Sequence, residues 1–149
     1  MVRIGHEIPD LELRAFHNGE IKEISLSQYR GQWLVLLFYP ADFTFVCPTE
    51  LEDAAGLYGQ FKAAGAEILS VSTDTEYVHA AWHEGSEAIG KVQYPMVADP
   101  TGRLSRTFGV YVEEAGLALR GTFIVDPDGQ YRTFSSLKQA ETALREVDG

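Results

Sequence analysis

Hydrophobic and polar residues alternate with a period of two near the start of the 149-residue chain, a pattern typical of β-strands. Residues 11–16 and 21–24 show this alternation on either side of Asn18-Gly19, a strong signal for a tight hairpin turn. The segment from Trp33 to Tyr39 is apolar throughout, as expected for a central strand that is covered on both faces. The pattern therefore predicts an antiparallel ribbon followed by a buried strand.

Residues 48–64 change to the period of an α-helix. Their apolar members share one face, namely Leu51, Ala54, Ala55, Tyr58 and Phe61. Gly65 follows as a helix stop, and residues 68–72 form a further apolar run that predicts a strand. A strand, a helix and a second strand in this order indicate a parallel crossover connection.

The second half of the chain continues the alternation of helices and strands. The pattern predicts a helix over 75–89, a strand over 94–97, a strand over 121–125 with a return over 131–134, and a final amphipathic helix over 136–147. No repeat or flexible linker interrupts this order. We therefore expect one α/β domain over residues 1–149, with a central mixed sheet and helices on both faces.

Charge and hydropathy narrow the possible functions. Acidic residues number 22 and basic residues 12, and a formal net charge of -10 repels nucleic-acid phosphates and anionic lipids. The longest apolar run, residues 33–39, is far shorter than the roughly 20 residues of a membrane helix, and the N-terminus has no signal-peptide pattern. We expect a soluble cytoplasmic protein without nucleic-acid or membrane partners.

The single cysteine, Cys47, stands where the buried strand gives way to a helix. Pro48 suits the first helical turn, where no backbone N–H is required. Free N–H groups and the positive end of the helix dipole favour the thiolate, which is the nucleophilic form, so we expect a lowered pKa for Cys47. The alternative is an inert buried thiol, the usual role of a lone cysteine. One cysteine also excludes a disulfide framework or a multi-thiolate metal site within these residues.

A cation is needed beside Cys47 if its thiolate is to be stabilised. A helix end contributes only about 1 kcal/mol, and the acidic residues at 50, 52 and 53 oppose it. Arg120 is the candidate, because it opens a strand predicted to lie beside residues 33–39 and its charge does not titrate. The alternative for Arg120 is an ordinary surface arginine at a strand end.

The residues around Cys47 form a longer motif. Pro40-Ala41-Asp42-Phe43-Thr44-Phe45-Val46-Cys47 is flanked by Phe38-Tyr39 and Pro48-Thr49-Glu50. This motif resembles the active site of the peroxiredoxins, in particular the typical two-cysteine group and the peroxidase subunit of bacterial alkyl hydroperoxide reductase. Further shared stretches are residues 71–75, 81–83, 99–102 and 119–127. The resemblance covers most of residues 3 to 129 and implies a thioredoxin-like fold.

The resemblance implies a peroxidase that needs neither metal nor cofactor and that reduces hydrogen peroxide and organic hydroperoxides through a sulfenic acid. The site residues that it implies are Cys47 as the peroxidatic thiol, Thr44 and Arg120 to orient the peroxide, Pro40 to shield the pocket from water, Val46 to offer backbone N–H, and Glu50 to hold Arg120. The implied partners are hydroperoxides and an external thiol reductant, either a thioredoxin-like protein or a flavin disulfide reductase. Copies of the chain are expected to assemble as a dimer or a ring of dimers.

The sequence departs from the two-cysteine group at its C-terminus. That group carries a resolving cysteine in a C-terminal segment, whereas this sequence stops at Gly149 with Cys47 as its one cysteine. A naturally short one-cysteine form, a truncation and a segment left out of the sequence are all open interpretations. Residues 131–136 also look short for the strand that pairs two subunits in the family, which puts the usual dimer in question. The alternative function is a catalytically impaired peroxiredoxin that acts as a redox sensor or a holdase-like assembly.

Two other groups of residues have simpler explanations. His79 and His83 are four apart on a predicted helix, but a metal site is not favoured without a third clear ligand. Asp126 and Asp128 lie in an Asp-Pro-Asp-Gly sequence that turn geometry explains. No glycine-rich phosphate loop occurs, so a nucleotide is not indicated.

Overall fold

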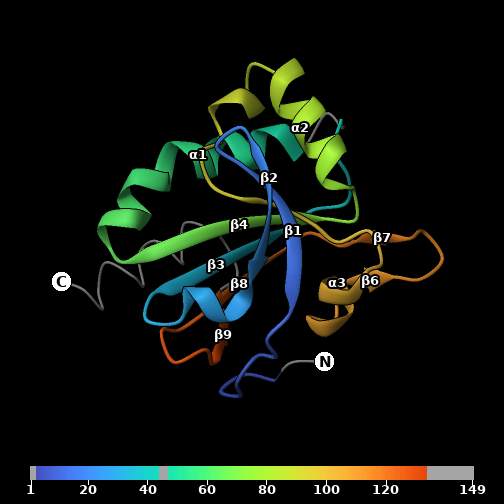
Figure 1. The fold of residues 1–149 in the computed structure, drawn as a ribbon. Coiled ribbons are helices and arrows are strands. Elements are labelled where there is room, and N and C mark those ends of the chain that lie inside the picture. Colours follow the sequence, from blue (N-terminus) through green and yellow to red (C-terminus); the bar gives the residue numbers. More distant parts are fainter. Residues whose placement is uncertain (1–2, 44–46, 134–149) are drawn as a thin grey trace.

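The computed structural model describes residues 3–43 and 47–133, which form a seven-stranded mixed β-sheet with helices packed against it (Figure 1). The strands of the sheet are β1 (Glu12–His17), β2 (Glu20–Ser25), β3 (Trp33–Phe38), β4 (Ala66–Ser72), β5 (Met96–Ala98), β8 (Gly121–Val125) and β9 (Tyr131–Thr133). The helices are α1 (Cys47–Ala63), α2 (Glu76–Gly85) and α3 (Arg103–Thr107), with short 3₁₀ helices at Leu26–Tyr29 and Ile89–Lys91. A two-stranded ribbon is formed by β6 (Tyr111–Val112) and β7 (Leu117–Ala118).

The strand order is β2-β1-β5-β4-β3-β8-β9. Strands β3, β4 and β5 run parallel to one another, and the remaining pairs are antiparallel. The predicted crossover from β3 through α1 to β4 is confirmed. The predicted first hairpin is confirmed too, because Asn18 (φ 53°) and Gly19 (φ 79°) take the left-handed conformations that a two-residue hairpin turn needs.

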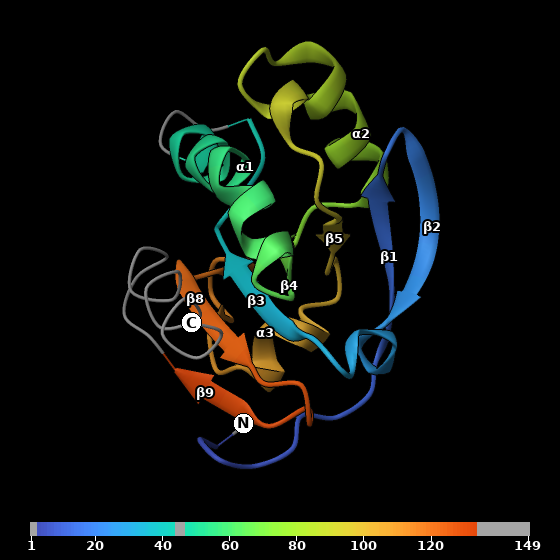
Figure 2. The ribbon, with the colours of Figure 1, turned by 90° about the vertical axis from the view of Figure 1, so that its left-hand side faces the viewer.

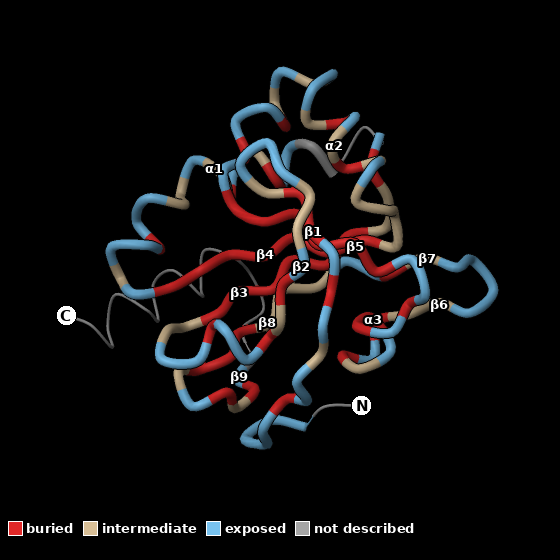
Figure 3. The backbone as a smooth tube through the Cα atoms, in the orientation of Figure 1, coloured by how far each residue is buried: buried red, intermediate tan, exposed pale blue. Residues whose placement is uncertain are grey.

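Two apolar layers explain why β3 is hydrophobic at every position. Side chains of β3 alternate between them, with Val35 and Leu37 facing the layer of α1 and α2, and Leu34 and Leu36 facing the layer that contains Leu104 of α3. Figures 1 and 2 show α1 and α2 on one side of the sheet and α3 on the other. Strand β4 is buried along its whole length (Figure 3). The predicted arrangement, a mixed sheet with helices on both faces, is therefore confirmed.

The structure corrects the predicted helix over residues 75–89. Helix α2 ends at Gly85, and the chain then forms the separate 3₁₀ helix Ile89–Lys91. Ile89 is nevertheless fully buried in the same layer as Trp82, so the sequence pattern merged two elements that share one apolar face. Helix α3 and the β6–β7 ribbon were not predicted, and the strand predicted at 94–97 lies at 96–98. The helix predicted over 136–147 lies outside the described residues.

The predicted second hairpin, β8 with β9, is confirmed. In its turn the Asp126 carboxylate accepts hydrogen bonds from the backbone N–H groups of Asp128 (3.0 Å) and Gln130 (2.9 Å) and pairs with Arg132 (3.2 Å). This aspartate therefore has the structural role that the turn sequence predicted. None of the helices within residues 3–43 and 47–133 has the length and apolar character that crossing a membrane requires.

Candidate active site

The sheet topology brings the main predicted site segments to one edge. Strand β3 ends at Phe38 opposite Gly121, the first residue of β8, so Pro40 and Arg120 both lie just beyond this edge. Helix α1 begins at Cys47, as predicted from Pro48, and its first turn carries Glu50. Thr44 and Val46 lie outside the described residues. Their roles, like that of the Cys47 thiol, stay predictions.

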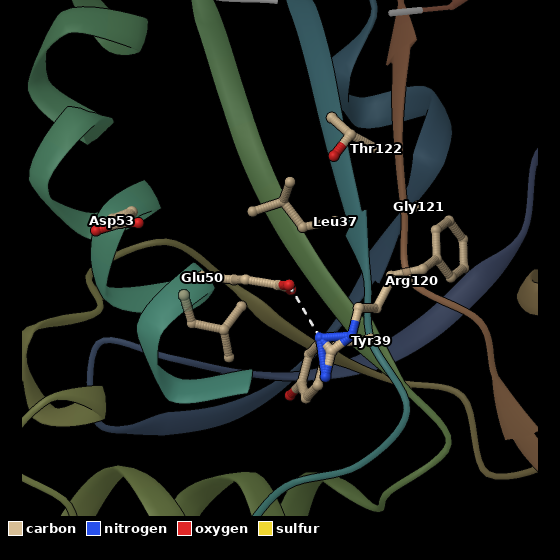
Figure 4. A pocket seen from close by; sticks show the side chains of 9 residues that line it. Leu37, Tyr39, Glu50, Asp53, Arg120, Gly121 and Thr122 are labelled. Carbon is tan, nitrogen blue, oxygen red and sulfur yellow. Dashed lines mark hydrogen bonds and ion pairs between the residues drawn. The ribbon is translucent and has the colours of Figure 1, made fainter. Parts of the chain in front are cut away.

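Arg120 and Glu50 form an ion pair across this edge. The Nη1 group of Arg120 donates to Oε1 of Glu50 at 2.9 Å, joining the start of β8 to the first turn of α1 (Figure 4). Their side chains are 38% and 48% exposed, so the pair is open to solvent and to a ligand. The structure thus shows the contact between Glu50 and Arg120 that the resemblance implies. The role of the two residues in catalysis stays a prediction.

A cleft of about 340 Å³ opens beside this ion pair. Its walls come from the end of β3, the first turns of α1 and the start of β8, and include Leu37, Leu51, Asp53 and Thr122 (Figure 4). The volume lies within the roughly 300–1,000 Å³ of small-molecule sites. The cleft thus places an arginine, two carboxylates and an apolar wall where α1 begins.

A second, buried ion pair joins the segment before Cys47 to helix α2. His79 of α2 meets Asp42 with Nδ1 2.6 Å from Oδ2, and both side chains are inaccessible to solvent. The Nε2 atom of His79 lies 2.9 Å from the carbonyl oxygen of Val97 in β5. Both ring nitrogens face acceptors, an arrangement that favours the protonated, positively charged form of His79. Burial alone would lower the pKa of His79, but the hydrogen bond and charge of Asp42 outweigh it and raise the pKa above its ordinary value.

Asp42 is held at its backbone as well as at its side chain. Its backbone N–H donates to the Asp74 carboxylate at 2.7 Å, which also accepts from the Ser72 hydroxyl at 2.7 Å. The Tyr39 hydroxyl donates to the other carboxylate oxygen of Asp42 at 2.5 Å. Asp42 therefore links the segment between β3 and α1 to two other parts of the fold by hydrogen bonds. One is Asp74, just after β4, and the other is His79 of α2, which in turn contacts β5.

This network was missed by sequence reasoning. The spacing of His79 and His83 directed attention to a metal, yet His83 points its Nε2 atom at the carbonyl oxygen of Val92, 2.9 Å away. No group of three metal-ligating side chains is found among residues 3–43 and 47–133. The available signal was Asp42 itself, a carboxylate next to a continuous apolar strand, but its partner lies 37 residues further along the chain.

Comparisons with known proteins agree with this arrangement. The model of the AhpC/TSA family matches residues 4–133. Alkyl hydroperoxide reductase C of Pseudomonas aeruginosa is 50% identical over 133 residues, and that of Bacillus subtilis is 53% identical over 133 residues; each match covers 89% of this chain and 71% of the relative. The chain belongs to the AhpC/TSA family. The predicted resemblance to the peroxiredoxins is thereby confirmed.

Solved structures support the same assignment. The crystal structure of Enterococcus faecalis AhpC superimposes with a TM-score of 0.91 at 41% identity and covers 99% of this chain and 93% of its own. Reduced 2-Cys peroxiredoxin of Plasmodium vivax gives a TM-score of 0.87 at 27% identity, covering 97% and 95%. These neighbours confirm the predicted thioredoxin-like fold.

Proposed function

We propose that this chain is a thiol-dependent peroxidase that reduces hydrogen peroxide and organic hydroperoxides at Cys47. The observation that carries this proposal is the start of α1 at Cys47, beside the Arg120–Glu50 pair and its cleft, in a chain about half identical to alkyl hydroperoxide reductase C. In the reaction, the Cys47 thiolate attacks one peroxide oxygen, an S–O bond forms and the O–O bond breaks. The departing oxygen takes up a proton, giving one sulfenic acid and one alcohol or water.

Arg120 has two tasks in this proposal. Its charge favours the thiolate before the reaction and stabilises the negative charge that develops on the departing oxygen. Glu50 fixes the guanidinium through the 2.9 Å contact, which restricts the directions in which the remaining N–H groups point. Thr44 and the backbone N–H of Val46 would complete the peroxide contacts, and Pro40 would limit the access of water, as the family resemblance implies.

Reduction of the sulfenic acid requires a thiol from outside the 149 residues, because Cys47 is the one cysteine among them. A first thiol displaces water and forms a mixed disulfide with Cys47, and a second thiol releases Cys47 as the disulfide of the two leaves. A thioredoxin-like protein or a flavin disulfide reductase would supply these electrons, and the family implies an assembly of several copies. A cytoplasmic location fits this cycle, because the thiol must be kept reduced.

The test is peroxide consumption by the wild type and by the Cys47→Ser variant, with a small thiol as reductant. We expect the variant to lose more than about a hundredfold in rate, because a hydroxyl is a far weaker nucleophile at neutral pH. Circular dichroism checks that both proteins are folded, and intact mass after one equivalent of peroxide should show one added oxygen in the wild type alone. Equal, slow consumption by both proteins would exclude the peroxidase and favour the redox-sensor alternative.

A further inference from the structure

The cleft beside Arg120 is much larger than hydrogen peroxide needs. Its volume of about 340 Å³ compares with the roughly 10–15 Å³ that one water requires by the same kind of measure. A second cavity, beside Tyr29 and Arg30, holds about 10 Å³. The active-site cleft therefore has room for the organic group of a hydroperoxide, and the chemistry of its walls decides which groups enter.

One wall of the cleft is apolar. Leu37 of β3 and Leu51 of α1 both line it, and Leu37 lies between the helix and β8 in Figure 4. Such a wall gains free energy by covering a carbon chain, because apolar surface is removed from water. The wall by itself does not distinguish neutral from charged hydroperoxides.

The charges of the cleft do make that distinction. Glu50 compensates Arg120 at 2.9 Å, which leaves the carboxylate of Asp53 as the third charge among the described lining residues. Asp53 lies three residues after Glu50 on α1, and both residues line the cleft. Asp53 is exposed, and its carboxylate makes no hydrogen bond or ion pair with residues 3–43 or 47–133. The three lining charges therefore sum to minus one.

We propose that Asp53 is a specificity-determining residue that makes the cleft favour neutral organic hydroperoxides over those that carry a carboxylate. The proposal rests on the peroxidase function proposed above. A carboxylate on the substrate would approach the Asp53 carboxylate in a site whose one described cation is already engaged by Glu50. The formal charge of -10 on the chain acts in the same direction at longer range.

The effect is moderate because Asp53 is exposed. Two like charges about 7 Å apart in a water-like medium change a rate by about twofold at an ionic strength of about 10 mM, and by about 1.5-fold at 0.15 M. The discrimination should therefore weaken as salt is added, which an apolar or steric preference would not do.

The experiment compares a tertiary alkyl hydroperoxide that carries a carboxylate with its methyl ester. We expect the ratio of kcat/KM for the acid to that for the ester to rise about twofold in Asp53→Asn at an ionic strength of about 10 mM. In the wild type the same ratio should rise with added salt. Using the ratio removes any common effect of Asp53 on the reactivity of Cys47, because both substrates meet the same thiol.

The matched control is Glu20→Gln, which removes one negative charge elsewhere. Glu20 is exposed at the start of β2, four strands from β3 in the sheet order, or about 19 Å at roughly 4.8 Å per strand. We expect its ratio to equal that of the wild type. A ratio that stays constant in Asp53→Asn, or that shifts equally in Glu20→Gln, would overturn the proposal. If the wild type consumes hydrogen peroxide and the ester but shows no effect of Asp53, the inference alone fails; if it consumes neither, the proposed function fails with it.

Discussion

Two acid–base pairs of similar geometry lie near the start of α1, one in the segment between β3 and α1 and the other in the first turn of the helix. Asp42 and His79 meet at 2.6 Å with both side chains inaccessible, whereas Glu50 and Arg120 meet at 2.9 Å with 48% and 38% of their side chains exposed. The first pair joins this part of the chain to α2, and the second joins it to the start of β8. The environments of the two pairs differ, and this difference predicts different roles for them.

A buried pair and an exposed pair contribute to stability in different ways. Removing one partner of a buried pair leaves a charge without water or counter-charge, which is costly. Removing one partner of an exposed pair lets water replace it, so the free energy of unfolding changes little. We therefore assign the Asp42–His79 pair to holding the segment in place and propose that the Glu50–Arg120 pair acts on the substrate.

The largest effect on stability is expected for His79→Ala. The substitution leaves the buried Asp42 carboxylate with the Tyr39 hydroxyl but without a counter-charge, and should lower the free energy of unfolding by about 3–5 kcal/mol. Urea unfolding near pH 6 measures it. A loss below about 1 kcal/mol would contradict the assignment, because that is the range of an exposed pair.

A smaller change in the free energy of unfolding is expected from pH, because a rise in pH removes part of the contribution of the Asp42–His79 pair. The pKa of His79 is raised in the folded state, so its contribution is complete below the unfolded value of about 6.5 and is lost as the pH rises through the higher folded pKa. The free energy of unfolding should therefore fall with rising pH above 6.5 more steeply in the wild type than in His79→Gln. Parallel pH profiles for the two proteins would refute the charged state of His79.

The wild type and His79→Gln must be compared because His17 contributes a pH dependence of stability with the opposite sign to that of His79. Burial, together with Lys22, lowers the pKa of His17, so its contribution to stability is lost as the pH falls below about 6.5. His17 is present in both proteins. The difference between the two profiles therefore isolates the Asp42–His79 pair.

The smallest effect on stability is expected for Arg120→Ala. The free energy of unfolding should change by less than about 1 kcal/mol, because the ion pair with Glu50 is exposed. The second-order rate of Cys47 oxidation should nevertheless fall by about a hundredfold, since the charge that supports the departing oxygen is gone. Stopped-flow fluorescence gives the rate. An unchanged rate would remove Arg120 from the site, and a large loss of stability would show that the two pairs do not differ as described.

The sequence predicted those parts of the fold whose signals are local. Asn18-Gly19 specifies its own turn, and the apolar run of β3 needs cover on both faces wherever it lies. Helix α3 and the β6–β7 ribbon are too short to show a period, and side-chain contacts with the backbone and with other side chains hold them. Asp99 accepts hydrogen bonds from the first turn of α3, and the Arg106 guanidinium lies 4.3 Å from the centre of the Tyr111 ring. Such contacts leave no repeat in the sequence.

The positions of some candidate site residues could also be predicted. Cys47 and Glu50 lie in a motif at a predicted helix start, and Arg120 comes directly before a predicted strand, and the structure places them so. The Asp42–His79 pair could not be predicted, because its partners lie 37 residues apart in the chain and meet only where α2 packs beside the segment after β3, with the Val97 carbonyl of β5 at the second ring nitrogen. The spacing of residues along the sequence does not predict contacts that form only when three elements pack together.

The position of β8 in the sheet also has a consequence for synthesis on the ribosome. Cys47 is translated 73 residues before Arg120, as 120 minus 47 gives, and β8 pairs with β3 only after residue 125 has been added. At roughly 5–20 residues per second this interval lasts about 4–15 seconds. During that time the nascent chain has its thiol but not the arginine proposed to activate it. The proposed peroxidase site is thus completed late, when most of the sheet has already been translated.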